Sequence, residues 1–133
     1  MKNAIKKLAI VTALLGTACA WNIAEASGTV QHPVADSIAK FDNQIASGTV
    51  ILDFFASWCG PCQNFGPVFT SAAKKHTNIL FIKINIDNYP KITKQFGVRS
   101  IPTIIALKDG KRIKSKTGFM NAAQFDAWIN GLK

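Results

Sequence analysis

The chain has 133 residues, of which 48% are apolar and 17% charged, with 16 Lys+Arg against 7 Asp+Glu and a formal net charge of +9. The length is that of a single domain, and the composition excludes an intrinsically disordered, collagen-like or low-complexity chain. The 3 cysteines are too few for a small protein held together by disulfides. Their odd number leaves one cysteine without a partner when the other two pair.

The first 26 residues have the pattern of a secretory signal peptide. Three lysines precede an uncharged, mostly apolar stretch at 8–20, which is shorter than the roughly 20 residues that span a bilayer. Two A-x-A cleavage sites follow, of which we prefer the one ending at Ala26 to the one ending at Ala20. A membrane-anchoring or buried helix, and a lipid anchor at Cys19, are the alternatives.

Cleavage at Ala26 determines which cysteines remain. It removes Cys19, three lysines and one glutamate, and leaves Cys59 and Cys62 in a chain of formal charge +7. Disulfides form and persist outside the cytosol. We therefore expect an exported protein of the bacterial periplasm with a single cysteine pair.

After residue 28, strand and helix patterns alternate. Strands are predicted at 29–32, 49–55, 79–85, 103–107 and 111–117, and helices at 38–46, 59–76, 89–96 and from 121 onward. Asp36 or Ser37 is expected to cap the first helix and Asn121 the last. Such alternation implies a parallel sheet with right-handed crossovers, to which the turn Asp109-Gly110 adds an antiparallel edge strand. We therefore expect an α/β fold with helices on both faces of four or five strands.

Basic residues crowd the last predicted hairpin. Arg112, Lys114 and Lys116 are expected to share one face of its second strand, with Ile113 on the other. Such charges keep an edge strand from pairing with other chains. Attraction to an acidic partner or an anionic membrane is an alternative. Nucleic acid is not expected as a partner, because aromatic residues do not alternate with the basic ones.

The segment 58–62 (WCGPC) lies where a buried strand ends and a helix begins. Cysteines at i and i+3 of a first helical turn are about 5–6 Å apart at Cβ, close to disulfide distance. So small a loop gains only about 2 kcal/mol from cross-linking, which disfavours a purely structural disulfide. The helix N-terminus stabilises a thiolate at Cys59, and Pro61 fits the first turn. The pattern favours a redox pair over a zinc site. A zinc site needs about four ligands, and only His32 and His76 could join the two cysteines as ligands.

Two further residues point to chemistry beside this pair. Asp53 stands in the middle of the buried strand 49–55, where it must be paired, hydrogen-bonded or protonated. Lys83 interrupts the apolar strand 79–85, which is expected beside it. A carboxyl group of raised pKa behind the helix start can take the proton of Cys62, although a purely structural ion pair is the alternative. Pro102 begins a central strand, where a cis peptide bond would explain a proline.

A series of segments carries a resemblance to a known family, namely FFASWCGPC, Pro67, KINID at 83–87, RSIPT at 99–103 and KDG at 108–110. These segments occur in the same order as in thioredoxins, which the chain resembles over residues 30–132. The resemblance implies a thioredoxin fold, with a central mixed five-stranded sheet and four helices, and dithiol–disulfide exchange without metal or organic cofactor. It implies that Cys59 is the attacking thiol and Cys62 the resolving thiol, with Asp53 as the buried acid and Lys83 as its partner. The substrate-binding positions implied by the resemblance are Trp58, Gly60, Pro61, Ile101, Pro102 and Gly118.

These patterns together predict a monomeric thiol–disulfide oxidoreductase that reduces protein disulfides outside the cytosol. The dipeptide Gly60-Pro61 is that of the reducing branch of the family. A reductant in an oxidising compartment must be recharged, so we expect a membrane carrier that brings electrons from the cytosol. The alternatives are an oxidant or isomerase of the same fold, and a non-catalytic holdase or adaptor that uses the groove around Trp58 and Pro102.

Overall fold

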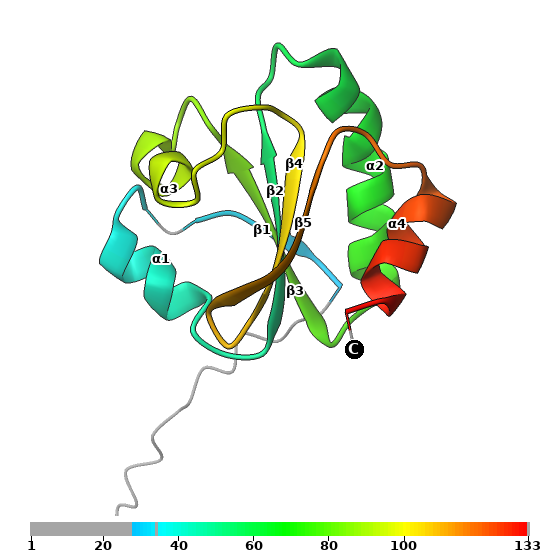
Figure 1. Cartoon of the computed structure of the whole chain (residues 1–133), viewed down its shortest axis with the longest axis horizontal. Helices are drawn as coiled ribbons and strands as arrows, with labels where there is room; N and C mark the ends of the chain where they lie inside the picture. Colours follow the sequence, from blue (N-terminus) through cyan, green and yellow to red (C-terminus); the bar gives the residue numbers. More distant parts are fainter. Residues whose placement is uncertain (1–27, 34, 133) are drawn as a thin grey trace, which may run out of the picture.

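A computed structural model describes residues 28–33 and 35–132 of the chain. The elements, in chain order, are β1 Val30–Gln31, α1 Ile38–Gln44, β2 Thr49–Phe55, α2 Gly60–Lys75, β3 Ile79–Asn85, α3 Pro90–Gln95, β4 Thr103–Lys108, β5 Lys111–Thr117 and α4 Ala122–Asn130. The strands form one sheet in the order β1-β3-β2-β4-β5. Helices α1 and α3 cover one face of it and α2 and α4 the other (Figure 1). The predicted mixed five-stranded sheet with four helices is confirmed.

The expected signal peptide, both cleavage sites and Cys19 lie outside the described residues. Within the described part of the chain, no helix combines the length and apolar character needed to cross a membrane.

Strand β2 supplies both hydrophobic cores, because its side chains alternate between the two faces of the sheet. Ile51 packs in the core beneath α2 and α4, together with the rings of Phe65 and Phe69. Leu52 and Phe54 belong to the core beneath α1 and α3. Since Asp53 alternates with Leu52 and Phe54, its carboxylate lies on the same face as α2.

Strand β4 runs antiparallel to β2, so the expectation that only the last hairpin departs from a parallel sheet is wrong. Thr103, the first residue of β4, pairs with Phe54 near the end of β2. The chain that leaves β3 through α3 therefore enters β4 at the end of the sheet where β2 and β3 stop. The alternation of strand and helix patterns does not record at which end of the sheet a connection re-enters.

A register irregularity in the β4–β5 hairpin corrects the expected arrangement of the basic residues. Lys114 pairs with Ala106, but Arg112 pairs with the next residue of β4, so Ile113 is an additional residue. Arg112 consequently turns toward α3, where its guanidinium donates to the Phe96 carbonyl at 2.6 Å. Lys114 turns toward α4 and donates to the Trp128 carbonyl at 3.0 Å. Arg112 and Lys114 thus lie on opposite faces of the sheet.

The cap of the first helix also differs from the prediction, whereas Asn121 caps α4 as expected in a capping box with Gln124. Ser37 occupies the N-cap position of α1 but makes no side-chain cap hydrogen bond. Asp36 instead caps α3, accepting from the backbone N–H groups of Lys91 at 3.1 Å and Ile92 at 3.3 Å. This bond fixes α3 to the segment before α1.

We expect Asp36→Ala to lower the free energy of unfolding by about 1 kcal/mol, the usual effect of removing a cap. Asp42→Ala is the matched control, because its exposed carboxylate accepts from the Gln95 side chain and from no other group within residues 28–33 and 35–132. That change should cost less than about 0.5 kcal/mol. Urea unfolding of the three proteins measures the difference, and equal losses in the two variants would contradict the capping role.

Candidate active site

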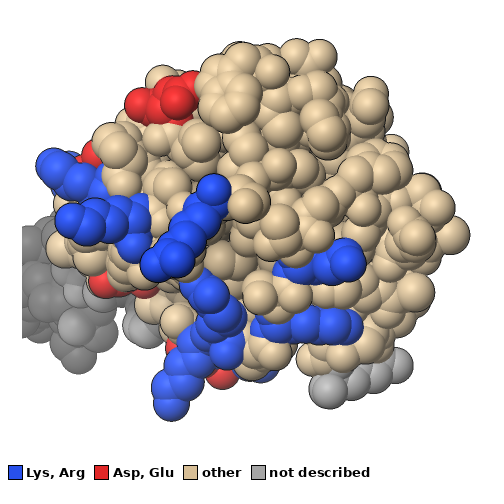
Figure 2. Space-filling view, turned by 45° about the horizontal axis from the view of Figure 1, so that its top comes forward, with Lys and Arg blue, Asp and Glu red and all other residues tan. Residues whose placement is uncertain are grey.

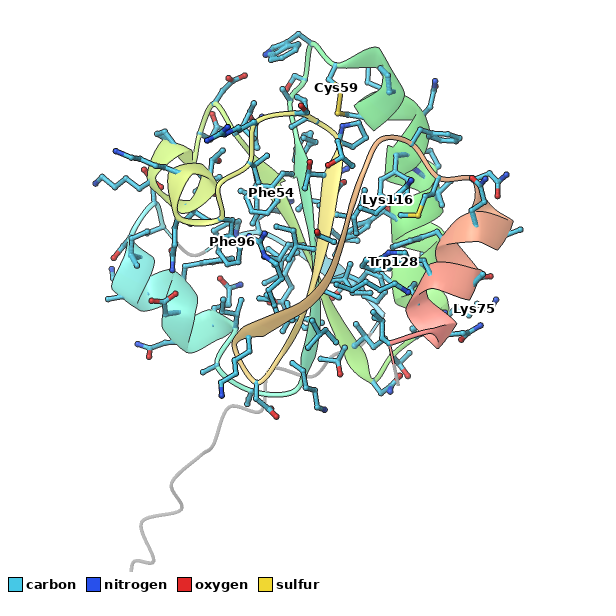
Figure 3. The ribbon with its side chains drawn as sticks, in the orientation of Figure 1. Phe54, Cys59, Lys75, Phe96, Lys116 and Trp128 are labelled. Atoms are coloured by element: carbon cyan, nitrogen blue, oxygen red, sulfur yellow. A yellow bond between two sulfur atoms is a disulfide. The ribbon has the colours of Figure 1, made fainter. Side chains whose placement is uncertain are left out.

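The redox pair lies at the end of the sheet where β2 stops and α2 begins. Cys59 and Cys62 form a disulfide, with Cα atoms 5.3 Å apart, and Figure 3 shows Cys59 at the start of α2. Cys59 is the N-cap of α2, and its sulfur accepts the backbone N–H of Cys62 at 3.3 Å. Cys59 is 6% exposed and Cys62 is 2% exposed. Cys59 is therefore the more accessible residue of the two, and its sulfur is the one that the helix amide stabilises.

The residues just before the disulfide are hydrogen-bonded to residues just after β3 and in α2. Trp58 is 70% exposed, and its indole N–H donates to the Asp87 carboxylate at 3.0 Å. Asp87 is itself positioned by its backbone N–H, which donates to the Asn85 side chain at 3.0 Å. The Gln63 amide donates to the Ser57 carbonyl at 2.8 Å. These bonds hold the indole beside the disulfide although most of its surface is in water.

The loops before β4 and after β5 complete the surface around the disulfide. The Ile101–Pro102 peptide bond is cis, as predicted. Ile101 packs against the small buried cluster of Ala56 and the two cysteines. The Gly118 N–H donates to the Pro102 carbonyl at 2.8 Å, and Gly118 has φ +96°, a conformation that favours glycine. This hydrogen bond holds the end of β5 against the proline loop.

Asp53 and Lys83 form the predicted pair across β2 and β3, where they are directly opposite in register. The Lys83 Nζ lies 3.2 Å from the Asp53 carboxylate and 4.4 Å from the centre of the Phe55 ring. Asp53 is fully buried, and neither of its carboxylate oxygens has a hydrogen bond of good geometry among the described residues. Burial raises the pKa of Asp53 to about 6, against the opposing effect of the Lys83 charge.

Gly66 shows where this pair lies relative to the disulfide. A Cβ atom built on Gly66 would be 3.6 Å from the Lys83 Nζ. Gly66 follows Cys62 by four residues in α2, which is about one helical turn. The ion pair therefore lies beneath α2, about one turn beyond the buried cysteine, on the face of the sheet that Asp53 shares with this helix.

The structure thus brings the predicted cysteines, Trp58, Ile101, Pro102 and Gly118 to one end of the sheet. It adds two residues that the sequence analysis missed. Asp87 closes the KINID segment, and an acid two residues after a buried strand was a signal that could have identified it as a partner for Trp58. Phe119 follows Gly118 and packs edge-to-face against Phe65 of α2, a contact for which the sequence holds no local signal.

Comparison with known proteins agrees with this geometry. The Thioredoxin family model matches residues 32–131. The chain belongs to the thioredoxin family. It is 42% identical to the thioredoxin of Chlamydia caviae over 94 residues, which cover 71% of this chain and 92% of that protein.

Solved thioredoxin structures show the same fold. The thioredoxin of Plasmodium falciparum superposes with a TM-score of 0.68 at 31% identity, over 77% of this chain and 97% of that one. The thioredoxin of Malassezia sympodialis superposes with a TM-score of 0.68 at 31% identity, over 78% of this chain and 90% of that one. As a thioredoxin, the protein is a thiol–disulfide oxidoreductase that reduces disulfides of protein substrates.

Proposed function

We propose that this thioredoxin reduces protein disulfides outside the cytosol, with Cys59 as the attacking thiol and Cys62 as the resolving thiol. The observation that carries the assignment of roles is the cap of α2. Cys59 is the more exposed residue of the two and its sulfur accepts a helix N–H, whereas Cys62 is more deeply buried. The same amide and the helix dipole stabilise negative charge on Cys59 when the disulfide is reduced.

The reaction proceeds in two exchanges. The Cys59 thiolate attacks one sulfur of the substrate disulfide, a mixed disulfide forms, and the first substrate sulfur leaves as a thiolate. Cys62 then gives its proton to the Asp53 carboxylate and attacks the Cys59 sulfur, which releases the second substrate thiolate. The protein ends as the Cys59–Cys62 disulfide, and the substrate has gained two electrons.

In this proposal the substrate lies on the surface around the disulfide, which is formed by Trp58, Gly60, Pro61, Ile101, Pro102 and Gly118. The half-buried Ile101 and the exposed Trp58 offer apolar contact on either side of the disulfide. Lys83 acts through Asp53, because its ammonium group favours the charged form of the carboxylate that receives the proton.

On reduction, we expect Cys59 to react with iodoacetamide at pH 7 at least about ten times faster than Cys62, since the Cys59 sulfur accepts a helix N–H and Cys59 is the more exposed residue. Peptide mapping after short labelling times measures both rates in the same molecule. Equal rates would contradict the assignment of Cys59 as the attacking thiol.

The redox potential should be that of a reductant. Thiolate stabilisation favours the dithiol and makes a pair more oxidising, but here only the helix start supplies it. Neither Gly60 nor Pro61 carries a charge, and the neutral Gln63 is hydrogen-bonded to Ser57. Equilibration with glutathione buffers should give a value closer to the roughly −270 mV of thioredoxin than to the roughly −120 mV of a strong periplasmic oxidant. A midpoint more oxidising than about −180 mV would favour an oxidant or isomerase instead.

The N-terminal pattern of charge and apolar residues supports the location outside the cytosol. In the source organism, we expect the mature protein to begin at Ser27, or at Trp21, and to be released with the periplasmic fraction. Leu14→Arg, which interrupts the apolar stretch 8–20, should retain the full-length chain in the cytosol. Full-length wild-type protein in the cytosol would contradict export, and a lipid on Cys19 would place the protein on a membrane. Under this proposal a membrane carrier of the thiol-relay type supplies the electrons.

A further inference from the structure

A cavity of about 420 Å³ lies between the end of β5 and α4, and no step of the reaction described above uses it. Its lining residues are Lys116, Phe119, Met120, Gln124 and Trp128. Figure 3 shows Lys116 and Trp128 near each other between β5 and α4, on the side of the sheet that carries α2. The volume lies within the range of about 300–1,000 Å³ that is usual for ligand pockets.

The cavity lies next to the redox end of the molecule, because its lining residue Phe119 directly follows Gly118. Gly118 is hydrogen-bonded to the Pro102 carbonyl, and the next residue, Phe119, places its ring 6.4 Å from that of Phe65. Phe65 follows Cys62 by three residues in α2, so both lie on the same face of the helix. A substrate chain that lies over Pro102 and Cys59 therefore reaches Phe119 within a few residues.

Exposed aromatic side chains lie on both sides of the disulfide. Trp58 is attached to Asp87 beyond the end of β3, whereas Phe119 follows β5. Strands β3 and β5 lie on opposite sides of the β2–β4 pair. Phe119 is 46% exposed and lines the cavity, so part of its ring is available to a substrate side chain there. The disulfide thus lies between two apolar contact points.

The charge at the cavity is positive. Among the described residues that line it, Lys116 is charged and no acid occurs. The Gln124 side-chain oxygen already accepts from the Asn121 N–H, which leaves its amide hydrogens as donors. Lys114 lies 5.2 Å from the centre of the Trp128 ring and adds a second positive charge nearby. Figure 2 shows more Lys and Arg than Asp and Glu on the face in view.

We propose that this cavity is a second substrate subsite. It takes an apolar side chain of the protein substrate, and an Asp or Glu next to that side chain in the substrate pairs with Lys116. The proposal rests on the reductase function and names a class of substrate for it. Preferred substrates carry their disulfide a few residues from an apolar residue that is followed or preceded by an acid. Contact at this point holds the substrate disulfide over Cys59 and lowers KM rather than raising kcat, because the subsite does not touch the reacting sulfurs.

The test compares two disulfide peptides that differ only near the cysteine, one with a Phe-Glu pair and one with a Phe-Lys pair. For the wild-type protein we expect kcat/KM to be about fivefold higher for the acidic peptide, an effect of KM. Lys116→Glu should reverse this ratio and Lys116→Arg should retain it. Lys111→Glu is the matched control, because Lys111 lies in the same strand and outside the cavity, and this variant should behave as wild type. Phe119→Ser should reduce kcat/KM for both peptides by about fivefold.

A binding measurement keeps the subsite separate from the redox reaction. The acidic peptide with serine in place of its cysteines should shift the backbone amide resonances of Phe119 and Gln124 in the wild-type protein, whether or not turnover occurs. Reduction of hydroxyethyl disulfide, which is too small to reach the cavity, reports the redox function alone. Absence of these shifts, or an equal change of the peptide ratio in Lys116→Glu and Lys111→Glu, would overturn the subsite. A change in sedimentation of Phe119→Ser without a change in peptide rates would also overturn it, in favour of an interface between two copies of the chain.

Discussion

Replacement of Cys59 by serine is expected to abolish the reduction of protein disulfides, with a loss of at least about 10³-fold that reflects removal of the nucleophile. Serine at this position keeps the cap of α2, because its hydroxyl oxygen also accepts the N–H of residue 62. The loss of activity should therefore occur without loss of the fold. Insulin reduction measured by turbidity, with dithiothreitol as electron donor, follows the activity.

Cys62→Ser is the informative partner of this change. The first exchange needs only the Cys59 thiolate, so this variant should still attack a substrate disulfide, but it lacks the thiol that releases the substrate. We expect it to accumulate as a mixed disulfide with the substrate, visible as a mass increase that dithiothreitol removes. Accumulation of the mixed disulfide by Cys59→Ser instead would reverse the assigned roles. Retained protein binding and activity in both variants would favour a holdase or adaptor.

The redox pair was predictable because its two cysteines lie close together in the chain. Cys59 and Cys62 lie within one helical turn, so their separation follows from helix geometry once the helix start is located. The Asp53–Lys83 pair was predictable for a different reason. A carboxylate in a buried strand requires a partner, and Lys83 is the one cation in the neighbouring apolar strand.

Features that depend on the packing of distant segments were not predictable in the same way. Asp36 caps a helix that begins 54 residues later, a contact between segments that are distant in the chain. Near α1, Asp36 and Ser37 are equally good N-cap residues by type, so the sequence does not distinguish them. The additional residue in β5 reverses the side of Arg112 relative to Lys114, and strand alternation alone gives no sign of it. The contact between Phe119 and Phe65 likewise depends on how the end of β5 meets α2.

The stability of the oxidised protein should fall as the pH rises from about 4 to about 6, because of Asp53. Its pKa is about 6 in the folded protein and about 3.8 when it is exposed. Below about pH 4 the carboxyl group is protonated in both states and its burial is tolerated. Above about pH 6 the folded protein must keep a buried charge that water would solvate in the unfolded chain, so about 3 kcal/mol of stability is lost. The disulfide removes any contribution from the cysteine thiols.

Asp53→Asn should remove this pH dependence and be more stable than wild type at pH 7.5, by about 1–3 kcal/mol after the cost of burying the amide. Urea unfolding between pH 4 and pH 8 measures both effects. Asp42→Asn, an exposed acid on α1, should follow the wild-type curve. Parallel curves for the wild type and Asp53→Asn would contradict the raised pKa of Asp53.

The same variant should be slower as an enzyme, although it is more stable. If Asp53 receives the proton of Cys62, its loss should slow release of the substrate from the mixed disulfide by about 10²-fold at pH 7, the usual contribution of a general base. The deficit should shrink at higher pH, where hydroxide deprotonates Cys62 without help. An unchanged release rate in a stabilised variant would reduce Asp53 and Lys83 to a structural pair. A slower rate would explain why the fold keeps a carboxylate in a place where it lowers stability, since the position that desolvates Asp53 is the one beneath the helix that carries Cys62.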